Sequence, residues 1–273
     1  MKKIVSVILI LILSAGIFNG CKKDKGTPPV LPLAGSMSID FSNFESGTKG
    51  DASAFLQKGT QTSNWEFAAG VAFIWKTIIY STLAVPVLSF QQAVNQKPVY
   101  LSDKTWEWSY DATILSVTYK ARLTGQIGTT NVIWKMYITK EGSGGFNDFM
   151  WFEGTSELDG TAGQWTLNLS PQNPVAVLQI DWEKSGEAIG NIKFTYIKAG
   201  DNFKDSYIEY GLTTGTLNAF YTIHYYDSSS LKFNDLNVEW STTLHNGRVK
   251  CPGHFGTTDW YCWDGNYLNI TCP

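Results

Sequence analysis

Apolar and polar residues alternate with a period of two through the second half of the chain. In the segment TILSVTYKARLT (residues 113–124), the odd-numbered residues from Leu115 to Leu123 are apolar or aromatic, and the residues between them are polar or charged. The same alternation recurs around Trp134, Leu167, Ile180, Phe194, Ile223 and Val238. Because successive side chains of a β-strand point to opposite faces of the sheet, this alternation predicts strands with one buried face.

Short polar clusters separate the predicted strands. Most of them contain Gly, Asn, Asp or Ser, as in KEGSGGFND and LDGTAG. About eight or more strands between residues 105 and 263, joined by such turns, are typical of an antiparallel meander. A parallel sheet would need crossover helices between its strands, and no helical pattern occurs in this part of the sequence.

A different pattern precedes the strands and predicts helices near residues 64–94. Ser63 or Asn64 can cap the helix, and Glu66 places a carboxylate at the positive end of its dipole. Apolar residues then occupy nearly every position, and Pro86 is expected to end a first helix and start a second, shorter one. A helix that is apolar on all faces is buried on most sides or spans a membrane. Lys76, in the middle of the run, is unfavourable in a membrane span, so we expect a helix buried within the protein.

The two patterns together predict one mainly β domain over residues 51–273. Its sheet needs a cover for the apolar face, and the preceding apolar helix is the element that can supply it. We therefore expect a strongly curved sheet or a barrel around the buried helix; the alternative is a β-sandwich with the helix at one end. The expected architecture is similar to the half-barrel of bacterial lipoprotein carriers and their outer-membrane receptors, although no shared motif carries that similarity.

The N-terminus has the features of an export signal. Residues 1–21 read MKKIVSVILILILSAGIFNGC, with two lysines, an apolar run and a small residue before Cys21. This stretch resembles the lipobox of bacterial envelope lipoproteins of the Bacteroidota type, except that Phe18 stands where the pattern usually has an aliphatic residue. The resemblance implies that residues 1–20 are removed as a signal peptide and that Cys21 is acylated. It also implies a membrane partner through the lipid anchor and a location in the cell envelope, at the outer membrane.

A tether is expected after the lipidated cysteine. Residues 22–35, KKDKGTPPVLPLAG, combine charge with three prolines, a composition that favours an extended spacer. We assign residues 21–50 to the lipidated cysteine and its linker. Without residues 1–20 the chain has 19 basic and 24 acidic residues. This acidic balance gives no reason to expect a nucleic-acid partner.

The sequence contains no recognisable catalytic motif. It has no G-x-S-x-G, no phosphate-binding glycine loop and no H-E-x-x-H, and its three histidines are His224, His245 and His254. The carboxylates Asp148, Glu153, Glu157 and Asp159 cluster in FNDFMWFEGTSELDG, where a solvated strand face explains them better than a catalytic pair or a calcium site. We therefore expect neither an enzyme nor a cofactor.

Aromatic residues are the candidates for ligand binding. WEWSYD places Trp106, Trp108 and Tyr110 on one side of a strand. If the row is buried, it belongs to the core; if it is exposed, it would form a stacking platform for sugar rings.

Two function classes remain. The first is a non-enzymatic lipoprotein that holds a lipid, an apolar small molecule or a partner segment between the sheet and its helix. The alternative is a surface domain for glycan binding or adhesion that uses exposed aromatics.

Three cysteines close the chain in CPGHFGTTDWYCWDGNYLNITCP. In an oxidising compartment we expect one disulfide, either Cys262–Cys272, which we favour, or Cys251–Cys262. A zinc site would use the three cysteines with His254, but the spacing C-x2-H-x7-C-x9-C matches no common structural zinc motif. We expect no metal site. A thiolate of Cys251 activated by His254 is a third interpretation, for which no residue that would orient the imidazole is evident.

Overall fold

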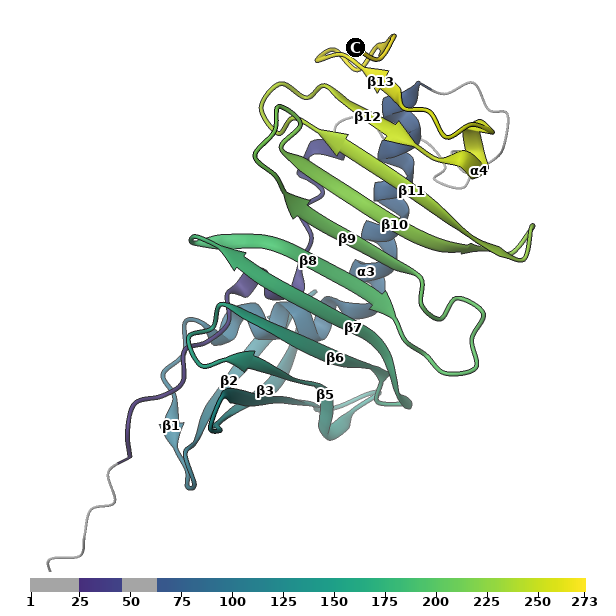
Figure 1. Ribbon diagram of the computed structural model, residues 1–273. Helices are drawn as coiled ribbons and strands as arrows, with labels where there is room; N and C mark the ends of the chain where they lie inside the picture. Colours follow the sequence, from purple (N-terminus) through teal and green to yellow (C-terminus); the bar gives the residue numbers. More distant parts are fainter. Residues whose placement is uncertain (1–24, 46–62) are drawn as a thin grey trace, which may run out of the picture.

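The computed structural model describes residues 25–45 and 63–273, and its centre is one open antiparallel sheet of fourteen strands (Figure 1). Each strand pairs with its neighbours in the sequence, and β1 and β14 form the two edges. The strands are β1 (Val99–Tyr100), β2 (Thr105–Ile114), β3 (Val117–Ile127), β4 (Asn131–Lys140), β5 (Phe146–Glu157), β6 (Ala162–Ser170), β7 (Asn173–Ser185), β8 (Ala188–Tyr196), β9 (Tyr207–Leu212), β10 (Ala219–Asp227), β11 (Lys232–Trp240), β12 (Gly247–Lys250), β13 (Tyr261–Trp263) and β14 (Asn269–Ile270). The predicted meander is confirmed, as a curved sheet that does not close.

The predicted helix is α3 (Asn64–Ala93), and its cap is the one expected from the sequence. The Ser63 hydroxyl accepts a hydrogen bond from the Glu66 amide at 3.1 Å, and the Glu66 carboxylate accepts one from the Ser63 amide at 2.8 Å. These two bonds satisfy amides that the first helical turn leaves without partners. The helix therefore begins where its sequence predicts.

The break in α3 lies earlier than predicted. Its arms, Asn64–Tyr80 and Leu83–Ala93, meet at 76°, whereas Pro86 lies inside the second arm. Because proline has no amide hydrogen, the carbonyl four residues before it loses its helical partner, and the helix bends near residue 82 instead of ending at the proline. Among the described residues, no single helix has the length and apolar composition to cross a bilayer; the two arms would meet those criteria only as a bent pair.

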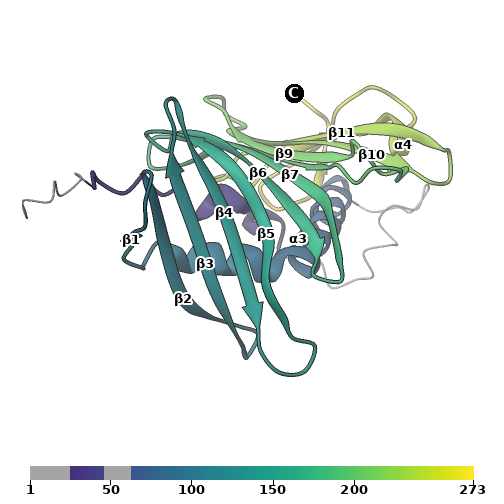
Figure 2. The ribbon, with the colours of Figure 1, turned by 90° about the horizontal axis from the view of Figure 1, so that it is seen from below.

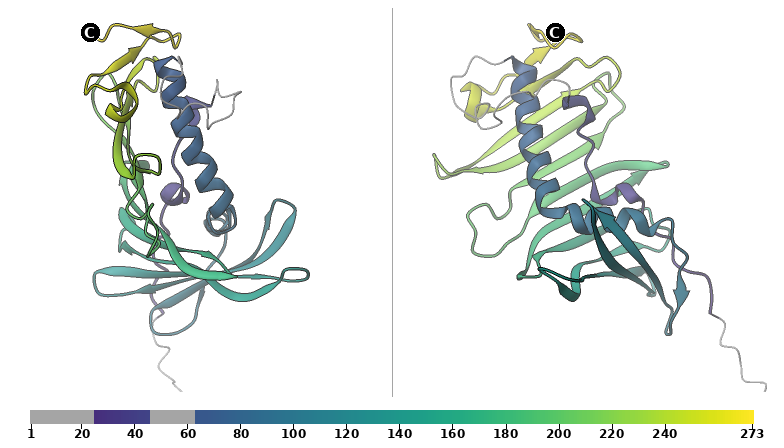
Figure 3. Two further views of the ribbon diagram at one scale, coloured as in Figure 1. Left: turned by 90° about the vertical axis from the view of Figure 1, so that its right-hand side faces the viewer. Right: turned by 180° about the vertical axis from the view of Figure 1, so that it is seen from behind.

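The sheet forms a trough that holds α3 on its concave side (Figure 3). Seen from below, β2–β5 turn away from the plane of β9–β11, and the second arm of α3 lies against them (Figure 2). The first arm contacts β12 and β13. The core between helix and sheet is rich in fully buried aromatic side chains, among them Trp134, Trp165 and Phe90. The predicted cover of the apolar face is therefore present.

The domain begins before the predicted boundary at residue 51. Two 3-10 helices, η1 (Ala34–Met37) and η2 (Ser42–Phe44), place Met37 and Phe44 in the core. The Ser36 hydroxyl accepts a hydrogen bond from the Trp165 indole at 3.2 Å. We predicted that residues 34–44 belong to the linker because their neighbours are charged and rich in proline. They are instead part of the fold. The signal peptide, Cys21 and residues 22–24 and 46–50 of the predicted linker lie outside the described residues.

Most of the buried tryptophans on the sheet stand opposite a glycine of the neighbouring strand. The register gives the pairs Gly125–Trp134, Gly154–Trp165, Gly163–Trp182 and Gly247–Trp263. In each pair, a Cβ atom added to the glycine would meet the indole ring closer than carbon atoms approach one another. The missing side chain therefore provides the space in which the indole lies flat on the next strand.

The segment 113–124 is not the continuous strand that its alternation suggested. Leu115 and Ser116 have φ of 48° and 66° and form a two-residue turn between β2 and β3, with Ile114 paired to Val117. Leu115 therefore lies at the tip of a hairpin and is exposed. Such turns favour Asn and Gly because both central residues have positive φ, so Leu-Ser gives no sequence signal for one.

Candidate functional site

An apolar cavity of about 430 Å³ lies between the first arm of α3 and the sheet. Its wall consists of Val71, Ile74, Trp75 and Ile78 of α3, with Tyr196, Phe203, Ser206, Ile223, Tyr225 and Tyr226 of β8, β10 and the β8–β9 connection. The helical residues recur at three- and four-residue spacing and share one helix face. A volume of this size falls within the range of roughly 300–1,000 Å³ that small-molecule sites occupy.

No charged side chain lines this cavity. The nearest polar network to its wall is that of Tyr196, whose hydroxyl donates a hydrogen bond to Asp201 at 2.9 Å. Asp201 also accepts from the Phe203 amide at 3.1 Å and pairs with Lys198 at 3.4 Å. These bonds fix the β8–β9 connection, which carries Phe203. Burial, and then the hydrogen bond and charge of Asp201, raise the pKa of Tyr196 to about 12, so the phenol stays protonated and neutral near neutral pH.

Tyr225 separates the cavity from the unpaired cysteine. Its hydroxyl lies 3.9 Å from Sγ of Cys251, which is fully buried. Burial raises the pKa of both the phenol and the thiol above their ordinary values. A buried thiol with a raised pKa contains little of the thiolate that acts as a nucleophile or metal ligand. Cys251 is therefore a structural side chain of the core.

His254 is not placed to activate Cys251. Its ring stacks on Phe67 at 4.0 Å and packs edge-on against Phe255 at 4.7 Å, while its backbone amide donates to the Cys251 carbonyl at 3.1 Å. Burial lowers the pKa of His254, so that the imidazole is neutral near neutral pH. The side chain thus packs α4 (Pro252–Phe255) against α3, and the Cys251–His254 pair gains no support from the structure.

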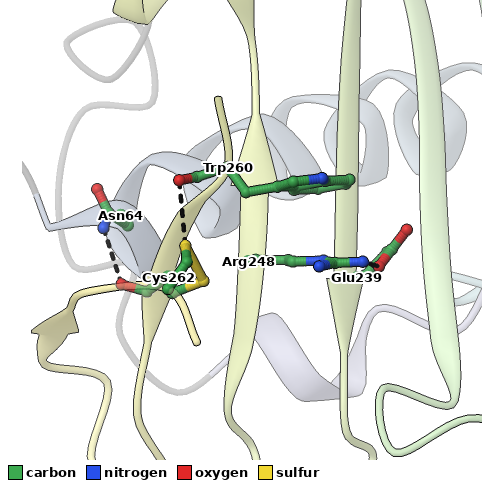
Figure 4. Close-up of a disulfide and its surroundings, with 6 residues drawn as sticks. Asn64, Glu239, Arg248, Trp260 and Cys262 are labelled. Atoms are coloured by element: carbon green, nitrogen blue, oxygen red, sulfur yellow. Dashed lines mark hydrogen bonds and ion pairs between the residues drawn. A yellow bond between two sulfur atoms is a disulfide. The ribbon is translucent and has the colours of Figure 1, made fainter. Parts of the chain in front are cut away.

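The favoured disulfide, Cys262–Cys272, is confirmed (Figure 4). It uses two of the four ligands of the zinc interpretation, and the described residues contain no group of three or more His, Cys, Asp or Glu that could hold a metal ion. The alternative pairing through Cys251 does not form. Beside the disulfide, the Cys262 carbonyl accepts a hydrogen bond from the Asn64 side chain at 2.9 Å. The tail is thereby joined to the first turn of α3.

The aromatic row of β2 packs toward the core. Trp108 is only 2% exposed and lies 5.7 Å from the ring of Trp134. The Tyr110 hydroxyl donates to the Ser89 carbonyl of α3 at 2.7 Å, and Trp106 packs edge-on against Tyr100. None of the three lines the apolar cavity. The row therefore faces the second arm of α3 and does not form a flat exposed platform.

The clustered carboxylates have local structural partners. Asp148 accepts two hydrogen bonds of 2.8 Å from Arg122, and Asp159 accepts from the amide and the hydroxyl of Thr161 at 3.1 and 2.6 Å. The Thr161 bonds lower the pKa of Asp159. Glu153 and Glu157 are exposed on β5. The arrangement contains no acid–base pair in a cleft, in agreement with a solvated face.

The cavity residues were not identified as a site from the sequence. The alternation placed Tyr196, Ile223 and Tyr225 on buried strand faces, but nothing in it distinguished cavity wall from filled core. Phe203 comes from a connection that the pattern described only as a turn. The one available signal was general: a helix that is apolar on all faces has to lie inside a sheet, and a ligand would lie between them.

Comparisons with known proteins gave no match, whether with protein-family models, with curated proteins or with solved structures.

Proposed function

We propose that the domain binds one uncharged apolar molecule, such as a lipid chain, in the cavity between α3 and strands β8–β10. The observation that carries this proposal is the cavity itself, a space of about 430 Å³ with an almost wholly apolar wall. The cavity is open to solvent beside Ile78 and Phe203, which line it and are both exposed, so an apolar molecule can reach it without rearrangement of the core. Binding an apolar ligand there would remove apolar surface from water on both sides.

The absence of charge from the wall selects the ligand. A carboxylate or ammonium brought into the cavity would lose hydration without gaining an ionic partner, which costs several kcal/mol or more. The part of the ligand inside the cavity is therefore neutral. Neither the neutral phenol of Tyr196 nor the buried thiol of Cys251 offers a base or a nucleophile, so the site binds without chemistry.

A charge introduced at the cavity wall should abolish this binding. Ile78 lines the cavity and is 52% exposed, so Ile78→Glu is expected to fold. Tyr80→Glu is the matched control, because Tyr80 lies on the same helix, is 50% exposed and does not line the cavity. With the neutral dye N-phenyl-1-naphthylamine as probe, we expect Ile78→Glu to weaken binding about tenfold or more and Tyr80→Glu to leave it near the wild-type value.

The dye titration is read from fluorescence, with circular dichroism of each variant to establish that it is folded. If the wild-type protein does not bind the dye, or if the two variants bind it equally, the cavity is not the binding site.

We further propose that the chain is an envelope lipoprotein anchored through Cys21. The support is the signal-like sequence of residues 1–21 and its resemblance to a lipobox. An anchored domain fits a protein that exchanges apolar molecules with a membrane, because the anchor keeps the cavity near the bilayer. One acyl chain alone gives only reversible binding, so stable anchoring needs a second membrane-binding signal in addition.

Cys21→Ser tests the anchor. We expect the wild-type chain, expressed in a Bacteroidota host, to incorporate an alkyne-labelled palmitate and to sediment with membranes, and Cys21→Ser to lose the label. Cys251→Ala is the control for a cysteine substitution elsewhere and should keep both properties. Label that persists in Cys21→Ser would place the acylation at another residue.

A further inference from the structure

The mouth of the cavity is bordered by exposed apolar side chains from two elements. Ile78 of α3 stands on one side of it, and Phe203 of the β8–β9 connection, 47% exposed, stands on the other. Both residues line the cavity and both reach solvent. A ligand entering or leaving the cavity would pass between apolar groups that are already accessible from outside.

The apolar surface continues from the mouth onto the neighbouring hairpin. The ring of Phe203 packs edge-on against Tyr226 at 5.8 Å, and Tyr226 packs edge-on against Phe233 at 5.4 Å. Phe233 is exposed, and Leu231, in the β10–β11 turn, is 70% exposed with a φ of 56°. We call Ile78, Phe203, Tyr226, Leu231 and Phe233 the mouth patch. Phe203 and Tyr226 line the cavity, and Tyr226 pairs with Phe233 on the face of the sheet opposite α3, so the mouth patch extends around the ends of β10 and β11.

The shape of this surface fits a lipid bilayer better than the broad surface of another protein. The β8–β9 connection and the β10–β11 turn project beyond the strands at the same end of the sheet (Figure 1). A protein interface of ordinary size is a broad, closely packed area, whereas projecting tips with single large apolar side chains can enter the boundary between lipid headgroups and acyl chains.

The composition of the patch fits the same partner. Leucine and phenylalanine bury in the acyl region, and tyrosine prefers the headgroup level because one end of its ring is polar. Lys232, beside Leu231 in the sequence, is exposed and forms no ion pair with any described residue. A lysine in this position can lay its stem along the apolar surface and keep its ammonium among the headgroups.

We propose that the mouth patch docks on the surface of a phospholipid bilayer, with Leu231 and Phe203 inserted, so that the cavity opens toward the membrane. Docking of this kind lets an apolar molecule move between bilayer and cavity without crossing water, where its exposure is unfavourable. The inference goes beyond the proposed function, because it concerns a surface that can bind membranes with the cavity empty.

Two exposed leucines at opposite ends of one strand provide the test. Leu231 precedes β11 and Leu244 follows it, so the two lie in turns at opposite ends of the strand, and Leu244 is 66% exposed. Asparagine tolerates the positive φ of Leu231, so Leu231→Asn should keep the turn. Leu244→Asn is the matched control. Both are made in a chain without residues 1–21, which removes the anchor and retains every residue that the structure describes.

Binding is measured by flotation with vesicles of phosphatidylethanolamine and phosphatidylglycerol. We expect the wild-type protein to float with the vesicles, Leu231→Asn to bind about tenfold more weakly, and Leu244→Asn to bind like the wild type. Phe203→Ser should weaken binding by a similar factor and serves as a second variant from a different element.

Several outcomes would overturn the docking. The wild-type protein would fail to float, or the two leucine variants would lose binding equally. Self-association of the wild-type chain that Leu231→Asn abolishes, without vesicle binding, would assign the patch to a second copy. A protein that binds the dye but no vesicles retains the proposed function and refutes the docking, and one that floats but binds no dye does the reverse.

Discussion

Gly154→Ala is expected to destabilise the domain by about 3 kcal/mol or more, although it adds a single methyl group. Gly154 lies in β5 opposite Trp165 of β6. A Cβ at this position would meet the backbone oxygen of Gln164 and would lie 2.5 Å from Cε3 of the Trp165 ring. Neither group can yield easily, because Gln164 belongs to the strand and Trp165 is fully buried with its indole bonded to Ser36. The clash with the added methyl group can therefore be relieved only if β5 and β6 move apart.

The measurement is urea unfolding followed by tryptophan fluorescence, with Gly215→Ala as the matched control. Gly215 has an ordinary φ, and the nearest atom to an added Cβ would be 3.6 Å away, which is a normal contact. We expect Gly215→Ala to change the free energy of unfolding by no more than about 0.5 kcal/mol. A Gly154→Ala protein as stable as Gly215→Ala would mean that the indole does not pack flat on this strand.

The pairing of glycine with tryptophan shows how far the sequence predicts the fold. The period of two predicted the strands, and the all-apolar segment predicted the helix that they enclose. The partners of the buried tryptophans depend on strand register, which a single sequence does not give. Gly154 and Trp165 are eleven positions apart in the sequence and face each other only because the turn between β5 and β6 sets that register.

Local backbone features account for the other differences. The Leu115–Ser116 turn has positive φ in residues that rarely adopt it, so a hairpin looked like one strand. Residues 34–44 were assigned to the linker because the segment before them is charged and rich in proline, although Met37, Ile39 and Phe41 alternate with polar residues and are buried. At the turn the tertiary structure decides, because the packing of the sheet compensates for a locally unfavourable backbone, whereas the alternation in residues 37–41 was a signal that the sequence did contain.

The candidate site was predictable in location and not in residues. An apolar helix inside a curved sheet implies that any internal ligand lies between them. The cavity exists because the first arm of α3 and strands β8–β10 leave a gap that Tyr196, Tyr225 and Phe203 border without filling. The helical part of its wall belongs to the first arm of α3 alone. The Trp106–Trp108–Tyr110 row, which the alternation made prominent, faces the other arm.

Removal of the Cys262–Cys272 disulfide is expected to destabilise the domain by about 2–3 kcal/mol, on the chain-entropy estimate for a loop of this length. The effect should reach α3, because the tail holds the first turn of the helix. The Asn64 amide donates to the Asn269 side chain at 2.8 Å, and the Asn64 side chain donates to the Cys262 carbonyl at 2.9 Å. An amide at the start of a helix has no partner within the helix, so these bonds stabilise its first turn.

The test uses the double variant Cys262→Ser/Cys272→Ser in a chain without residues 1–21, so that Cys251 is the one cysteine left. Its midpoint in urea should fall, and dithiothreitol should have no further effect on it. Cys251→Ala, the control, should keep the full sensitivity of the wild type to dithiothreitol, because its disulfide is intact. Amide hydrogen exchange should then show faster exchange at both β13 and the first turn of α3 in the double variant. Faster exchange at β13 alone would mean that the disulfide fixes the C-terminus and that the capping box of Ser63 and Glu66 is sufficient to hold the helix.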